Sequence, residues 1–99
     1  MKLTSKQRAY LKGLASNLTP LFQIGKSNLT PEITALVDEA FNNRELIKIN
    51  VLKNSDEDIN VMANALADRT GATLVQVIGK KIVLYKENKD NKVIELPKA

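Results

Sequence analysis

The sequence predicts a single α/β domain, folded as a two-layer sandwich with a mixed four-stranded sheet. Segments with the apolar spacing of helices alternate with short segments that have the alternation of strands. The last two strand segments are separated by a short glycine-containing turn, as in a hairpin. The length of 99 residues suits one compact domain. The expected order is α-β-α-β-α-β-β, in which the first strands are largely parallel and the hairpin adds an antiparallel strand.

The first helix is expected to begin at Thr4 or Ser5, since either side chain can cap a helix. Its apolar side consists of four residues at helical spacing: Tyr10, Leu11, Leu14 and Leu18. Arg8 and Lys12 lie together, roughly on the opposite side. The proline that opens residues 20–24 ends the helix, because the residue before a proline avoids the helical region. Residues 20–24 then form a short strand.

The second helix has the strongest signals, with Thr30 as N-cap and Pro31 at the first helical position. Five apolar residues follow at helical spacing: Ile33, Leu36, Val37, Ala40 and Phe41. Asn42-Asn43 can close the helix, because asparagine tolerates the left-handed conformation of a C-cap.

Residues 45–52 alternate as a half-buried strand, with isoleucine and valine on one face and Lys48 and Asn50 on the other. Gln23 and Gln76 can join that polar face. Part of the sheet is therefore expected to face solvent, or to be covered only by the first helix.

The third helix is expected to be capped by Ser55 or Asp56 and stopped by Gly71. Its apolar face consists of Ile59, Met62, Ala63 and Leu66. Strands 73–78 and 82–86 then form the hairpin around Gly79-Lys80-Lys81. The core of the domain spans about residues 1–87, and residues 88–99 are either a tail or contain a last edge strand over 93–96.

The composition excludes most catalytic and metal-site chemistries. The chain has no cysteine and no histidine, so it lacks thiol nucleophiles, disulfides, the usual zinc ligands and histidine acid–base catalysis. An EF-hand loop starting at Asp56 would need glycine at Val61 and glutamate at Ala67. We therefore expect neither an enzyme nor a bound cofactor or metal. Without a signal peptide or a long apolar run, a soluble cytoplasmic protein is expected.

Charge is unevenly distributed along the chain, whose net charge is +4. Five basic residues precede the first acidic one, Glu32: Lys2, Lys6, Arg8, Lys12 and Lys26. Four acidic residues fall in a stretch without basic residues: Asp56, Glu57, Asp58 and Asp68. The molecule is expected to be electrically two-sided, with a basic side that favours a polyanionic partner.

The loop Gly25-Lys26-Ser27-Asn28 contains the Gly-Lys-Ser end of a phosphate-binding P-loop. The full P-loop needs a second glycine where Pro20 stands, and the following helix starts only at Thr30, so nucleotide hydrolysis is rejected. Two interpretations stay open. The loop is a connecting turn with a solvated lysine, or it holds phosphate through close backbone approach and the charge of Lys26.

Three blocks of sequence at these distances resemble the YhbY-type RNA-binding proteins, the CRM (chloroplast RNA splicing and ribosome maturation) family. They are LTSKQRAYLKGLASNLTPLFQIGKSNLT, ELIKINVL and GATLVQVIGKKIVLYK, and the resemblance covers residues 1 to about 87. It implies a fold similar to the C-terminal domain of bacterial translation initiation factor three, RNA binding without catalysis, and association with ribosomal RNA in precursors of the large subunit. In the family the loop usually ends in glycine, where this chain has Asn28, and arginine often stands where it has Lys86.

The candidate RNA contacts are the loop residues Gly25, Lys26, Ser27 and Asn28 together with six other basic residues: Arg8, Lys12, Lys48, Lys80, Lys81 and Lys86. For each of the six an ordinary solvated or paired role stays open. Tyr10 is expected in the core, whereas Tyr85 either packs in the core or stacks on a base. The partner expected is ribosomal RNA, bound by a monomer without a membrane or small-molecule ligand. The alternative is a protein–protein interaction adaptor whose basic end is incidental.

Overall fold

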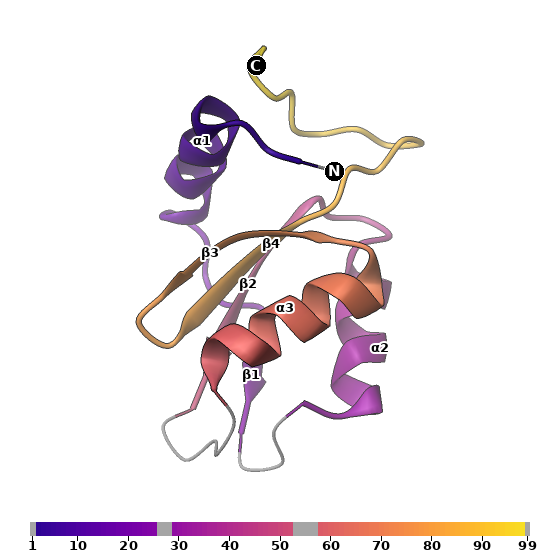
Figure 1. Ribbon diagram of the computed structural model, residues 1–99. Coiled ribbons are helices and arrows are strands. Elements are labelled where there is room, and N and C mark those ends of the chain that lie inside the picture. The colour runs from indigo at the N-terminus through magenta and orange to yellow at the C-terminus, as the bar shows by residue number, and fades with distance from the viewer. Residues whose placement is uncertain (1, 26–28, 53–57, 99) are drawn as a thin grey trace.

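The computed structural model describes residues 2–25, 29–52 and 58–98. Within these ranges three helices and four strands follow the predicted order (Figure 1). Their bounds are α1 Ser5–Ala15, β1 Phe22–Ile24, α2 Pro31–Ala40, β2 Leu46–Val51, α3 Ile59–Thr70, β3 Thr73–Ile78 and β4 Lys81–Tyr85. The predicted α/β class is confirmed. None of the described helices has the length and apolar character needed to cross a lipid bilayer.

The strands form one mixed sheet in the order β1-β2-β4-β3. β1 and β2 are parallel, whereas β4 is antiparallel to both of its neighbours, as the sequence predicts for the hairpin. The insertion of β4 between β2 and β3 could not be predicted from the sequence. It leaves β1 and β3 as the edge strands.

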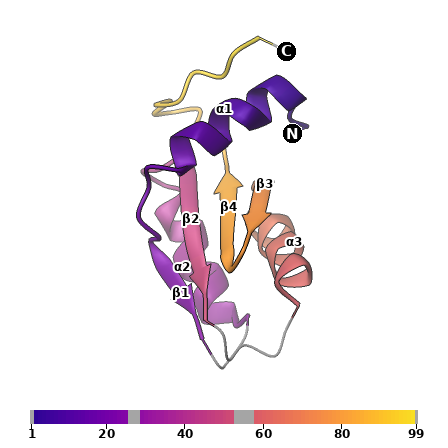
Figure 2. The same ribbon diagram turned by 90° about the vertical axis from the view of Figure 1, so that its left-hand side faces the viewer.

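The two faces of the sheet are covered differently. α2 and α3 pack together against one face, where they bury the main core between helices and sheet (Figure 1). On the other face α1 lies across one end of the strands, so the rest of that face is open (Figure 2). A smaller apolar cluster lies beneath α1: Leu3, Leu11, Ala15, Leu46, Val75, Val83 and Tyr85. The sequence left open whether this face is exposed to solvent or covered only by the first helix, and in the structure one part is covered by α1 and the rest is open (Figure 2).

Side-chain caps define where the helices begin. The Thr4 hydroxyl accepts from the backbone N–H of Gln7, and the Gln7 side chain accepts from the Thr4 N–H, which completes a capping box. Thr30 caps α2, with Pro31 in its first turn, as predicted. The predicted caps Ser55 and Asp56 lie outside the described residues, and the N-cap of α3 is Asp58. α3 therefore begins at Ile59, later than expected.

The helix ends agree with the sequence in one case and differ in two. Gly71 ends α3 in the left-handed conformation, with φ of 72°, as predicted. The C-cap of α2 is Phe41 in the right-handed region, so no left-handed asparagine closes this helix, and that prediction was wrong. α1 ends at Ala15, before Leu18.

The orientation of α1 also corrects an expectation. Leu11 and Ala15 are its buried residues, whereas Tyr10 is 43% exposed and Leu14 and Leu18 are exposed as well. The buried stripe is displaced by about one residue from the predicted one, because Leu11 belongs to both possible stripes and only the shape of the sheet selects between them. Tyr10 is therefore not a core residue, and Arg8 turns toward the sheet rather than away from it.

The hairpin has a two-residue turn, Gly79-Lys80, and Lys81 is already the first residue of β4. Gly79 has φ of 58°, a left-handed value that glycine adopts at little cost. The register of β3 against β4 shifts between Leu74 and Gln76. At this irregularity Val75 has no cross-strand partner in the register.

The C-terminal segment forms no strand in its described part but is held to the domain. The Glu45 carboxylate, 3% exposed as a residue, accepts backbone N–H bonds from Asn88, Val93 and Ile94. Gln7 Nε2 donates to the Pro97 carbonyl at 3.0 Å. Ile94 and Leu96 pack against the cluster beneath α1. Of the two sequence interpretations, residues 93–96 thus match a tail, one that is packed in place.

Candidate nucleic-acid interface

Three parts of the chain meet at the end of the sheet where β1 and β2 finish and the β3–β4 turn lies. The Leu52 N–H donates to the Ile24 carbonyl at 2.8 Å, and the Val51 N–H donates to the Lys80 carbonyl at 2.7 Å. These bonds hold the last residues of β1, the last residues of β2 and the hairpin turn side by side. We call this region, defined by Gly25, Leu52, Gly79 and Lys80, the loop end of the sheet.

Gly25 follows β1 directly at the loop end. Its φ is not in the left-handed region, and a Cβ added there would lie 3.5 Å from Leu52 Cδ1, an ordinary van der Waals distance. The fold therefore does not require glycine at this position. The other predicted loop residues, Lys26, Ser27 and Asn28, lie outside the described residues.

The hairpin turn brings two lysines to the loop end. Lys80 is exposed in the turn, and Lys81 is half-buried at the start of β4, opposite Asn50. Within residues 2–25, 29–52 and 58–98, neither ammonium group has a hydrogen-bond or ion-pair partner. Both charges are thus available to an anionic ligand.

Three other predicted RNA contacts are bound to main-chain carbonyl groups instead. Arg8 Nη1 donates to the carbonyl oxygens of Leu74 and Val75, at the irregular point of β3. Its guanidinium therefore has two main-chain acceptors within the protein. This contact joins α1 to the edge strand.

Lys48 and Lys86 lie at helix C-termini. Lys48 Nζ donates to the carbonyls of Ala15 at 3.2 Å and Leu18 at 3.4 Å, where α1 ends. Lys86 Nζ donates to the Thr70 carbonyl at 2.8 Å, at the end of α3, and lies 3.8 Å from a carboxylate oxygen of Asp38. Cations at these positions satisfy free carbonyls and oppose the negative end of the helix dipole.

The sequence-predicted contacts do not form one patch. Gly25, Lys80 and Lys81 come together at the loop end, whereas Lys12 is exposed on α1 at the other end of the open sheet face (Figure 2). Lys86 follows β4 at the end farthest from the hairpin turn. The loop end is therefore the place where the described candidates gather.

Tyr10 is exposed rather than in the core as expected, whereas Tyr85 has the core position that was one of its two expected roles. Tyr85 is 1% exposed in the cluster beneath α1, and burial raises the pKa of its hydroxyl, with a further increase from the charges of Glu45 and Glu87. A buried ring cannot stack on a base without movement of α1 or the C-terminal segment. Core packing is therefore the role of Tyr85 in this structure.

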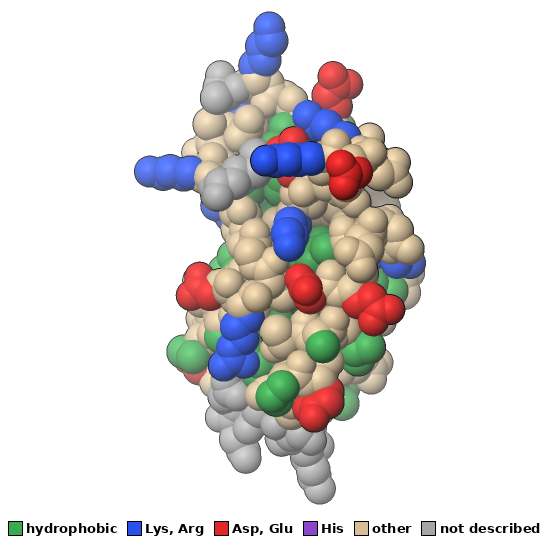
Figure 3. Space-filling model, turned by 90° about the vertical axis from the view of Figure 1, so that its right-hand side faces the viewer, with side chains coloured by type: hydrophobic (Ala, Val, Ile, Leu, Met, Phe, Trp, Pro, Cys, Tyr) green, Lys and Arg blue, Asp and Glu red, His purple; other side chains and the backbone are tan. Residues whose placement is uncertain are grey.

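Acidic residues lie nearer to the loop end than the charge pattern of the sequence predicts. Asp58 caps α3, which begins at the same end of the molecule as the hairpin turn (Figure 1). Asp56 and Glu57 lie outside the described residues. The side of the molecule that carries α2 shows acidic and basic side chains interspersed (Figure 3). The described residues form no continuous basic surface on that side (Figure 3).

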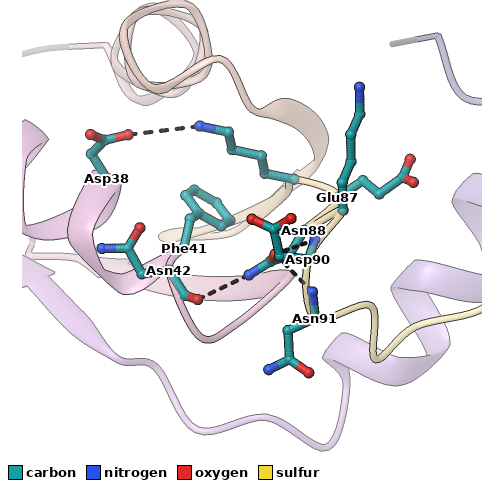
Figure 4. A pocket seen from close by; sticks show the side chains of 9 residues that line it. Asp38, Phe41, Asn42, Glu87, Asn88, Asp90 and Asn91 are labelled. Carbon is teal, nitrogen blue, oxygen red and sulfur yellow. Dashed lines mark hydrogen bonds and ion pairs between the residues drawn. The ribbon is translucent and has the colours of Figure 1, made fainter.

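A polar pocket lies at the opposite end of the molecule from the hairpin, between the end of α2 and the segment after β4 (Figure 4). Its polar groups bind one another. Asn88 Nδ2 donates to the Asn42 carbonyl at 2.9 Å, and the N–H groups of Asp90 and Asn91 donate to Asn88 Oδ1 at 3.1 Å. These bonds order the turn that leads into the C-terminal segment.

Comparison with known protein families identifies the family of this chain. The CRS1/YhbY (CRM) domain model matches residues 3–86, which is most of the chain. The chain belongs to the CRM domain family. The family resemblance inferred from the three sequence blocks is thus confirmed.

Relatives of this CRM domain match it over nearly their whole length. "Probable RNA-binding protein YqeI" of Bacillus subtilis is 50% identical, over 96% of this chain and 99% of the relative. A Haemophilus influenzae protein named "RNA-binding protein" is 38% identical, over 97% and 96%. The solution structure of protein SAV1595 from Staphylococcus aureus has a TM-score of 0.82 and 48% identity, covering 97% of this chain and all of the other.

Sequence reasoning missed one residue that organises this CRM domain. Glu45 stands at the start of the strand pattern, where the sequence suggests an ordinary exposed carboxylate at the end of a strand. Its partners are backbone groups more than 40 residues away, and backbone groups leave no residue-type signal in a sequence. The polar sheet face, by contrast, could be found from the alternation of β2.

Proposed function

We propose that this CRM domain binds RNA at the loop end of the sheet, with ribosomal RNA in precursors of the large subunit as its target in the cytoplasm. The observation that carries the proposal is the junction of the ends of β1 and β2 with the hairpin turn, held by the bonds from Leu52 to Ile24 and from Val51 to Lys80. The names of the Bacillus and Haemophilus relatives support RNA as the ligand.

The chemistry of the site fits phosphate binding rather than catalysis. Lys80 and Lys81 supply two cations without partners in the described structure, and the backbone at Gly25 can be approached closely. Phosphate contacts of this kind give affinity through charge and counterion release, without information about the base sequence. The chain has no histidine or cysteine, so it lacks histidine acid–base catalysis and thiol nucleophiles, and the proposed role is binding.

The test of the site compares two double variants that remove the same charge. Lys80→Ala/Lys81→Ala removes both cations of the loop end, and Lys89→Ala/Lys98→Ala removes two exposed lysines beyond β4. In fluorescence anisotropy with single-stranded RNA, we expect the first pair to weaken binding about tenfold or more, and the second pair less than about threefold, because only the first removes phosphate contacts. Equal losses for both pairs would contradict the proposed position of the site.

The identity of the RNA is tested in cells. Crosslinking of the protein to RNA, followed by sequencing of the bound fragments, is expected to enrich large-subunit ribosomal RNA and its precursors. Enrichment of other RNAs would refute the ribosomal target. A stoichiometric protein partner with no bound RNA would instead favour the interaction adaptor.

A further inference from the structure

The open part of the second sheet face adjoins the loop end. The register places Gln23 beside Asn50, Asn50 beside Lys81, and Lys81 beside Ile78, so the side chains of one row cross all four strands on this face. Gln76 lies in the next row, opposite Val83. With strands about 4.8 Å apart, the row spans roughly 14 Å.

α1 leaves this row uncovered. It crosses the sheet at the far end, and the hydrogen bonds from Lys48 to the Ala15 and Leu18 carbonyls mark the border between the covered and open parts of the face (Figure 2). Gln23 is exposed, Asn50 and Gln76 are half-buried, and Ile78 is 57% exposed. The surface is therefore a solvated platform of amides with one lysine, Lys81, and one apolar side chain.

The three amides are free to bind a ligand. Among the described residues, no other protein group hydrogen-bonds the side chains of Gln23, Asn50 or Gln76. Each carboxamide presents a donor and an acceptor, the combination that pairs with the edges of nucleic-acid bases. An open sheet face with this chemistry resembles a base-reading surface more than a phosphate-binding one.

The platform lacks the other common means of holding bases. Of the two tyrosines, Tyr85 is buried on the covered part of this face and Tyr10 lies on α1. Both phenylalanines belong to the core on the opposite face, so no aromatic ring is available in the open rows for stacking. Ile78 supplies apolar contact instead, and base selection falls to the amides.

We propose that the platform of Gln23, Asn50, Gln76 and Ile78 reads the bases of a single-stranded RNA segment by hydrogen bonding. The inference rests on the proposed RNA-binding function. Because Gly25 follows Gln23 closely in the chain and Lys81 shares the row of Asn50, phosphates held at the loop end leave the attached bases within reach of the platform. Single-stranded RNA fits because only unpaired bases expose their hydrogen-bonding edges to an open surface.

The experiment measures selectivity separately from affinity. Dissociation constants are determined for four labelled decamers, oligo(A), oligo(C), oligo(U) and a random-sequence pool, with the parent and with Gln23→Ala/Asn50→Ala/Gln76→Ala. The parent is expected to discriminate between the tightest and weakest decamer, and the triple variant to reduce that ratio at least fivefold, since a well-placed amide–base pair discriminates by about that factor or more. Its salt dependence should stay unchanged, because no phosphate contact is lost.

The matched control is Asn60→Ala/Asn64→Ala, which removes two exposed amides from α3 on the other side of the sheet. It should keep the parent's ratio. If the triple variant fails to fold by circular dichroism, the single variant Gln76→Ala replaces it, with a smaller loss of selectivity expected.

The outcomes distinguish the two proposals. A parent that binds every decamer equally, or a folded variant that keeps the parent's ratio, overturns base reading while RNA binding stands. A parent that binds none of the decamers at low salt overturns the proposed function and base reading with it. Loss of selectivity in the control as well would show that the amides of the platform are not the cause.

Discussion

At the scale of single residues, the structure separates basic side chains that stabilise the fold from those that remain available. Arg8, Lys48 and Lys86 each donate to carbonyl oxygens at the bulge of β3 or at helix ends. These three side chains lie near other basic residues in the sequence, but their hydrogen bonds are made within the protein. Lys80 and Lys81 have no such acceptors in the described structure. A basic side chain is therefore a good candidate for RNA contact only when it has no hydrogen-bond acceptor within the protein.

Gly25 gives a residue-scale prediction. Gly25→Ala should change the melting temperature by less than about 3 °C, because φ is not left-handed and the added Cβ meets Leu52 at an ordinary distance. Its affinity for RNA should nevertheless fall, by about fivefold or more, if phosphate approaches the backbone at this point. Thermal unfolding and fluorescence anisotropy measure the two effects.

The comparison for this variant is Gly13→Ala, on the exposed side of α1, where an added Cβ meets nothing within 4 Å. It should leave RNA affinity unchanged and raise stability slightly, because alanine favours a helix. Parent-like affinity in Gly25→Ala would show that the loop is only a connection at that residue.

At the scale of elements, the C-terminal segment depends on one carboxylate. Burial by itself would raise the pKa of Glu45, but the N–H groups of Asn88, Ile94 and Val93 and the charge of Lys92 lower it by more. Because the folded pKa lies below the unfolded one, the ionised carboxylate adds stability above the ordinary value of 4.5, and that stability is lost as the pH falls below it through the folded pKa.

Glu45→Gln is expected to lower stability at pH 7 by about 1–3 kcal/mol, since the amide replaces a charged acceptor of three N–H bonds. The difference from the parent should shrink as the pH falls below about 4.5. Denaturant unfolding across this range measures it. Glu95→Gln, on an exposed carboxylate of the same segment, should show no such difference at pH 7, and an equal loss there would refute the special role of Glu45.

At the scale of the whole molecule, the predictable features were those encoded in short stretches. Thr30-Pro31 and Gly71 mark helix ends by local chemistry, and the alternation through Lys48 and Asn50 reveals the polar sheet face. Strand order, the destination of Arg8 and the bonds of Glu45 depend on groups distant in sequence, many of them backbone. For the same reason only part of the candidate site could be predicted. Residue type identifies the basic side chains, but only the packing shows which of them already donate to carbonyl groups of the protein.

The salt dependence of RNA binding tests the molecule as a whole, because the net charge of +4 belongs to the entire chain and the side that carries α2 mixes acidic and basic side chains (Figure 3). If three to five phosphates are contacted, log K should fall against log salt with a slope of about −2 to −3.5, at roughly 0.7 per phosphate of a single strand. Lys80→Ala/Lys81→Ala should make that slope shallower by about 1.4, the share of two contacts, whereas Lys89→Ala/Lys98→Ala should leave it unchanged. Binding titrations from about 50 to 200 mM salt resolve this difference. A slope near zero in the parent would mean that apolar or hydrogen-bonding contacts dominate, and an equal change in both variants would mean that the protein's overall charge, rather than the loop end, attracts the RNA.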